Sequence, residues 1–102
     1  MRRVVVSRQA LAELEEIEDY ISGDSSRAAR RVVDDLIETV ESLRHDAHVH
    51  GYHRAVGPSL RRLKRHDYLN FFVVRGQQVD VVGVIHGKRD LLGVLEGRLP
   101  HG

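Results

Sequence analysis

Basic side chains border a hydrophobic part of this sequence at both of its ends. Before the apolar runs 68–74 and 79–85 stand Arg61, Arg62, Lys64, Arg65 and His66, and after them stand His86, Lys88 and Arg89. Arginine and lysine can neutralise the phosphates of a nucleic-acid backbone. The same set could cleave RNA without a metal, because histidines can act as acid and base while arginines stabilise the charged transition state. A third interpretation is structural, since basic side chains often protect an edge strand from aggregation.

The sequence contains no motif typical of most other catalytic or ligand-binding sites. It contains no cysteine and no phosphate-binding loop, GxGxxG, HExxH or GxSxG motif. Four histidines, His45, His48, His50 and His53, lie close together, but their segment contains glycine and has no periodicity that would bring the imidazoles together. We therefore interpret 45–58 as an exposed loop, and we expect neither a metal site nor a cofactor.

Length and charge narrow the class of protein. The 102 residues, of which 41% are hydrophobic, favour a single domain, 1–102. Residues 1–46 carry seven basic and eleven acidic side chains, whereas 47–102 carry nine and four, so the second half should attract nucleic acid or an acidic partner. No segment has the length of a membrane span or the features of a signal peptide, which predicts a cytoplasmic protein with no membrane partner.

The elements that must position these side chains begin with a strand and two helices. A β-branched run predicts a strand over 2–6, and Ser7 is a suitable N-cap for the helix that follows. Spacings of three and four predict one buried stripe on each helix. The stripes are Leu11, Leu14, Ile17 and Ile21 in the first helix, and Ala29, Val32, Val33, Leu36, Ile37, Val40 and Leu43 in the second. Gly23 interrupts the pattern, which predicts an antiparallel helical hairpin.

The second half of the chain has the pattern of strands. We expect strands at 60–65, 68–74 and 79–85, and a short helix at 91–95. Alternation places Arg61, Leu63 and Arg65 on one face of the first of these strands. The expected fold is therefore α+β: an N-terminal strand, an antiparallel helical hairpin, a three-stranded antiparallel sheet segment and a short C-terminal helix. The ends of the second and fourth strands should then lie close together.

Several segments resemble the RelE/ParE superfamily of toxins. The resemblance rests on the order of the elements, on the strands LRRL (60–63) and YLNFFVV (68–74), and above all on VIHGKRDL (84–91). It implies the toxin half of a type II toxin–antitoxin pair, which forms a hetero-oligomer with its cognate antitoxin. Antitoxins of this superfamily dock on the helical hairpin and sheet, which here implies contacts near Leu14, Ile17, Ile21 and Leu36.

Two positions bear on the activity that the resemblance implies. RelE-like members cleave messenger RNA on the ribosome, whereas ParE-like members act on DNA gyrase. The ribonucleases carry an arginine where this chain has Leu69 and a tyrosine where it has Leu95. Arg62 and Arg89 match basic positions of the ribonucleases, but the acid–base set is incomplete without the other two. We therefore expect the ParE-like form, which binds a protein target rather than acting as an enzyme.

Three hypotheses follow for the basic residues. A ParE-like toxin would bind gyrase through Arg61, Arg62, Lys64, Lys88 and Arg89. A ribosome-dependent ribonuclease acting on messenger RNA would instead use Arg62, Lys64, His66, His86 and Arg89. A non-toxic member of the superfamily would bind its partner without acting on either target.

Overall fold

The expected order of elements is present in the computed structural model, which describes residues 1–54 and 56–99. The elements are β1 (Arg3–Val6), α1 (Arg8–Ser22), α2 (Ser26–Asp46), the 3₁₀ helix η1 (Ala47–Val49), β2 (Arg61–Arg65), β3 (Tyr68–Arg75), β4 (Gln78–His86) and α3 (Leu91–Leu95). Every predicted strand lies within one residue of its observed bounds. Among the described residues, no helix is long and apolar enough to cross a membrane.

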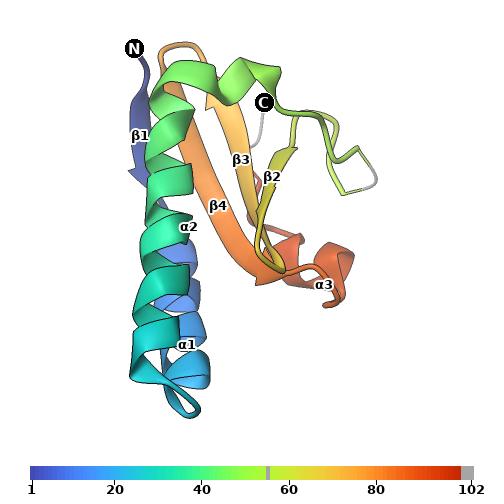
Figure 1. The fold of residues 1–102 in the computed structure, drawn as a ribbon. Helices are drawn as coiled ribbons and strands as arrows, with labels where there is room; N and C mark the ends of the chain where they lie inside the picture. Colours follow the sequence, from blue (N-terminus) through green and yellow to red (C-terminus); the bar gives the residue numbers. More distant parts are fainter. Residues whose placement is uncertain (55, 100–102) are drawn as a thin grey trace.

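The four strands form one sheet in the order β1-β4-β3-β2. β1 is parallel to β4, and the other neighbours are antiparallel. The chain enters at one edge, passes through the α1–α2 hairpin, and reaches the opposite edge at β2 before β3 and β4 fill the middle (Figure 1). The connection between the two helices extends past the end of the sheet (Figure 1). The α+β fold expected from the sequence is confirmed.

Serine caps fix where both long helices begin. The hydroxyls of Ser7 and Ser25 each accept the backbone N–H three residues later, both at 3.1 Å. The end of α2 was predicted too early, because the helix continues to Asp46 and a 3₁₀ turn follows it. Ala47 in that turn is fully buried, so packing against the core extends the helical structure into the segment 45–58 that we interpreted as a loop.

Apolar side chains are buried on both faces of the sheet. The face covered by α1 and α2 contains Leu14, Ile17, Leu36, Phe72, Val81 and neighbouring residues. The other face contains Leu60, Phe71, Val73, Val82, Ile85 and Leu95, which pack with further residues of α3 and of the segment before β2. β3 contributes to both clusters, which explains why its sequence is apolar at nearly every position.

The buried stripes of the helices are narrower than predicted. Leu11 and Ile37 are 51% and 47% exposed, whereas α1 instead buries Ala10 and the carboxylate of Glu13. The sheet and the partner helix cover one side of each helix, so side chains on the outer flank of the stripe remain in water.

Within the described residues, the second half of β4 has no neighbouring strand on one side, because β1 pairs with Gln78 to Val81. Glu13 and Arg98 occupy this free edge. Glu13 Oε1 accepts the Val84 N–H at 3.1 Å, and Arg98 Nη1 donates to Glu13 Oε1 at 3.0 Å and to the Val82 carbonyl at 3.3 Å. Two side chains thus bond backbone groups that a neighbouring strand would otherwise pair.

Candidate functional site

Two connections between elements meet at one end of the sheet. In the strand register Arg65 lies opposite Tyr68, and Tyr68 lies opposite His86. This brings the β2–β3 turn and the β4–α3 connection together, as expected from the sequence. The Gly87 N–H donates to the Asp67 carbonyl at 3.0 Å, which joins the two connections directly.

The β2–β3 turn holds its histidine in an unusual backbone conformation. His66 has φ 55°, in the left-handed region that residues other than glycine seldom adopt. Its Nε2 lies 2.8 Å from Asp35 Oδ2 on α2, and Nε2 must donate because a carboxylate only accepts. Arg65 Nη2 lies 3.6 Å from the same oxygen. The hydrogen bond from His66, followed by the positive charge of Arg65, holds the pKa of Asp35 below its usual value.

A groove of about 660 Å³ runs between this end of the sheet and the helical hairpin. Its helical side is lined by Glu13, Glu16, Ile17, Tyr20, Ile21 and Val32, and its other side by His66, Asp67, Tyr68, Val84, Ile85, His86 and Arg89. The Tyr68 and His86 rings meet edge to face with their centroids 5.4 Å apart. Burial raises the pKa of Tyr68, and its hydroxyl can donate a hydrogen bond. The groove therefore combines an apolar floor with hydrogen-bond donors, basic groups and three carboxylates.

Lys64 and Lys88 meet beside this groove, where they line a smaller hollow of about 310 Å³ with Leu69, Asp67, His86 and Gly87. Arg89, on the other side of the β4–α3 connection, lines the groove itself. All three cations are exposed, and none has an ion-pair partner among residues 1–54 and 56–99. We call Lys64, Lys88 and Arg89 the basic end.

Two residues that we expected in the target-binding set lie apart from the basic end. Arg61 donates to the His50 carbonyl at 2.6 Å and to the Tyr52 hydroxyl at 2.8 Å, and its guanidinium lies 4.0 Å from the centre of the Tyr52 ring. These contacts attach the segment before β2 to the strand, so Arg61 has a structural role. Arg62 contacts His53 Nδ1 at 2.6 Å and lies opposite Phe71, three register positions from Tyr68.

The histidine-rich segment divides into two parts. Among the described residues, no three histidine or acidic side chains are grouped so that they could hold a metal ion. His45 and His48 are exposed, in agreement with the exposed loop that we expected. His50 and His53 are half-buried, with their rings against Phe72 and Phe71, so this interpretation is wrong for them. Burial, followed by the charge of Arg62, lowers the pKa of His53.

The residues expected to contact an antitoxin are mostly inaccessible. Leu14, Ile17 and Leu36 are 9%, 7% and 0% exposed, because the apolar stripes of α1 and α2 pack against the chain's own sheet. Ile21 is half-buried, and only Ile17 and Ile21 line the groove. Tyr20, 81% exposed at the rim of the same groove, was not selected from the sequence. Its exposure follows from its place beside the stripe, which the periodicity alone could have indicated.

Leu69 and Leu95, the two departures from the ribonuclease pattern, are both part of the second apolar cluster. Leu95 is fully buried, and a Cβ added at Gly83 would lie 3.0 Å from one of its methyl groups. Leu69 is half-buried beside the Lys64–Lys88 hollow.

Comparisons with known proteins agree with this fold. The family model described as the ParE toxin of type II toxin-antitoxin system, parDE, matches residues 4–91. A solved structure described as the chromosomal ParDE TA system from P. aeruginosa is similar, with a TM-score of 0.72 and 25% sequence identity. The match covers 84% of this chain and 96% of that chain. None of the curated proteins matches.

Proposed function

The chain belongs to the ParE family of toxins from type II toxin–antitoxin systems, and on this premise we propose that it stops growth by binding DNA gyrase through the basic end. The observation that supports the proposal most directly is the free charge of Lys64, Lys88 and Arg89 at one end of the sheet. Cations without internal partners are available to pair with an acidic target surface, and such pairs add affinity and steer association.

The burial of Leu95 agrees better with a protein-binding role than with ribonuclease chemistry. At the position where the ribonucleases carry a tyrosine, Leu95 is fully buried beneath the sheet. A catalytic group must reach the reacting atoms within hydrogen-bonding distance, and a leucine in the core offers none. The basic residues that remain could bind phosphate or carboxylate groups, but binding alone does not transfer a proton.

One observation favours the ribonuclease as a second candidate. His66, His86 and Arg89 all line the same groove, and the hydrogen bond to Asp35 orients the His66 ring. A histidine oriented by a carboxylate can serve as a general base, and a second histidine could donate the proton to the leaving oxygen. In this case the groove would receive messenger RNA on the ribosome.

Two reactions run side by side with the purified chain distinguish these candidates. One measures DNA supercoiling by gyrase, and the other measures the integrity of messenger RNA in a cell-free translation mixture. We expect loss of supercoiling with intact messenger RNA. Cleavage of messenger RNA at the ribosome would reject the gyrase proposal, and an unaffected result in both reactions, without growth arrest on expression, would identify a non-toxic family member.

Variants of the basic end test the site itself. Lys88→Ala and Arg89→Ala should each weaken inhibition of supercoiling on the order of tenfold, which corresponds to about 1.4 kcal/mol of binding free energy. Arg75→Ala is the matched control, because Arg75 is an exposed arginine of the same sheet about 23 Å from the start of β3. Equal effects of Arg75→Ala and Arg89→Ala would reject the basic end as the binding site.

We propose that the cognate antitoxin covers the groove, with an apolar side chain against Ile17 and Ile21 and further contacts to Tyr20. The support is the apolar floor of the groove and the 81% exposure of the tyrosine at its rim. Large aromatic side chains left in water are common anchors of protein interfaces. An antitoxin in this position would lie next to Arg89 and would block the basic end from the target.

Paired substitutions test where the antitoxin docks. Ile21→Asp should abolish co-purification with the antitoxin, because it places a charge in the apolar floor of the groove. Ile37→Asp makes the same change at an exposed residue of α2 that does not line the groove, and should retain the complex. Loss of the complex in Ile37→Asp but not in Ile21→Asp would instead assign docking to the outer flank of the hairpin.

A further inference from the structure

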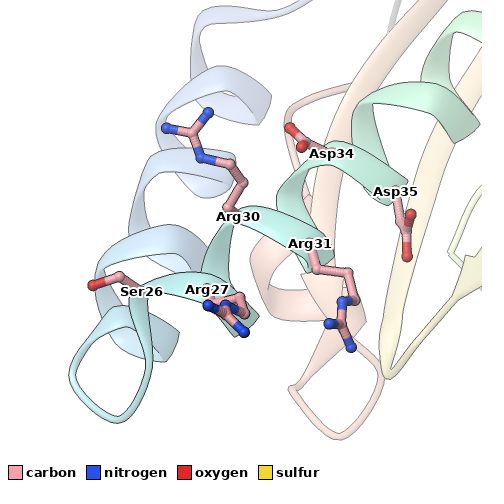
Figure 2. Close-up of a pocket in the computed structure, with 6 residues that line it drawn as sticks. All are labelled: Ser26, Arg27, Arg30, Arg31, Asp34 and Asp35. Carbon is pink, nitrogen blue, oxygen red and sulfur yellow. The ribbon is translucent and has the colours of Figure 1, made fainter.

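The first two turns of α2 carry three exposed arginines that neither the predicted site nor the proposed function uses: Arg27, Arg30 and Arg31 (Figure 2). Within the part of the chain that the structure describes, none of the three has an ion-pair partner. Arg27 and Arg31 are four residues apart, a spacing at which like charges repel on a helix. Arg27 also lies in the first turn, near the positive end of the helix dipole. The cluster therefore opposes the stability of the helix that carries it.

The three side chains do not point the same way. In Figure 2 the guanidinium groups of Arg27 and Arg31 lie on one side of α2, whereas Arg30 points to the other side. Arg27 and Arg31 are separated by about 6 Å along the helix axis, one turn apart. With Ser26, Arg30 and two aspartates they line an open hollow of about 590 Å³.

Two aspartates of α2 follow Arg31, and one of them is already bonded elsewhere. Asp34 lies three residues after Arg31 and is exposed at the hollow, whereas the carboxylate of Asp35, four residues after Arg31, pairs with His66 at 2.8 Å and with Arg65 at 3.6 Å. Its charge is thus compensated from the β2–β3 turn. The side chain of Arg65 is 49% exposed, so it continues the positive surface from α2 onto β2. We call Arg27, Arg31 and Arg65 the α2 basic face.

We propose that the α2 basic face binds the phosphate backbone of duplex DNA. Guanidinium groups match phosphate oxygens with two parallel hydrogen bonds, and the Ser26 hydroxyl in the same hollow is a further donor of the kind that contacts phosphates. Arg27 and Arg31 follow one another along α2, one turn apart, and the phosphates of a duplex are likewise regularly spaced. The six residues that line the hollow are all polar or charged. The aromatic side chains that anchor many protein interfaces are not among the residues of the hollow, which favours a phosphate ligand.

The probe is a fluorescently labelled DNA duplex of arbitrary sequence, and binding to the purified chain is followed by fluorescence anisotropy over a range of salt concentrations. Three phosphate contacts predict that the logarithm of the binding constant falls with the logarithm of salt with a slope of about −2.7. Arg27→Ala and Arg31→Ala should each reduce the magnitude of that slope by about 0.9. The binding does not rest on gyrase being the target, since DNA is the only partner in this measurement.

Arg8→Ala is the matched control, because Arg8 is an exposed arginine at the start of α1, at the other end of the helical hairpin, and does not line the hollow. It should leave the slope unchanged, and circular dichroism should show all three variants folded. Equal losses in Arg8→Ala and Arg31→Ala would mean diffuse attraction without a site and would overturn the proposal. Tighter binding of a glutamate-rich peptide than of DNA, with the same dependence on Arg27 and Arg31, would also overturn it and identify an acidic protein as the partner.

Discussion

Removal of Glu13 should destabilise the fold far more than its place on a surface helix suggests. Its side chain is 10% exposed and that of Arg98 is 15% exposed. In Glu13→Ala the guanidinium of Arg98 loses its only carboxylate among the described residues, and the Val84 N–H loses its acceptor. The resulting unpaired groups remain at the free edge of β4, where neither solvent nor another strand replaces the lost contacts completely.

The size of the effect follows from this burial. Loss of one partner of a buried ion pair costs about 3–5 kcal/mol, and the residual exposure of both side chains places our expectation at about 3 kcal/mol. For a domain of this size that corresponds to a fall in melting temperature of roughly 15 °C. Removal of both charges in Glu13→Ala/Arg98→Ala should cost less than Glu13→Ala and Arg98→Ala together, with a coupling free energy of about 2 kcal/mol.

The four proteins of this double-mutant cycle can be compared by urea unfolding followed by circular dichroism at neutral pH. Arg75→Ala serves as the control, because it breaks an ion pair with Asp80 in which the arginine side chain is 55% exposed. Exposed pairs contribute at most about 1 kcal/mol. The reasoning would be refuted if Glu13→Ala lowered the free energy of unfolding no more than Arg75→Ala, or if the changes in the cycle were strictly additive. Either result would mean that Glu13 and Arg98 do not stabilise the free edge of β4 as a pair.

Two pH-dependent outcomes follow from the pKa shifts. The pKa of Asp35 in the folded protein lies below its ordinary value of 3.8, first because His66 donates a hydrogen bond to its carboxylate. The pair therefore stabilises the fold at pH values above 3.8, and this stabilisation is lost as the pH falls through the pKa of Asp35 in the folded protein. Urea midpoints should therefore separate Asp35→Asn from the wild type at pH 7 and bring them together at pH 2. The pKa of His53 lies below its ordinary value of 6.5, mainly through burial, so an NMR titration of Arg62→Ala should show a pKa raised only part of the way towards 6.5.

Local signals in the sequence were sufficient for most of the fold. Ser7 predicted the start of α1, and the break at Gly23 predicted the hairpin of helices. Gly76, with φ 60°, marks the tight turn between β3 and β4, where a side chain would be strained. Each of these features depends on a few neighbouring residues, so a single sequence contains the information that fixes it.

The contacts that complete the site join residues far apart in the chain, and local patterns cannot predict them. Asp35 and His66 are separated by 31 positions, and Glu13 and Arg98 by 85. Nothing in the local sequence distinguishes the carboxylate of Asp35 from its exposed neighbour Asp34. The pairing is decided by the distance between α2 and the β2–β3 turn, which is set only when both pack on the same sheet.

The alternation along β2 determines which of its cations a partner can reach. Arg61 and Arg65 point to the face covered by the helices. There Arg61 donates to a carbonyl group of the segment before β2, and Arg65 forms an ion pair with Asp35. Lys64 points to the opposite face and meets Lys88, with no carboxylate of the described residues within ion-pairing distance of either. Four cations in five residues therefore do not form one binding surface, because the strand divides them by face. We expect target binding to depend on Lys64, Lys88 and Arg89 rather than on the number of charges along the sequence.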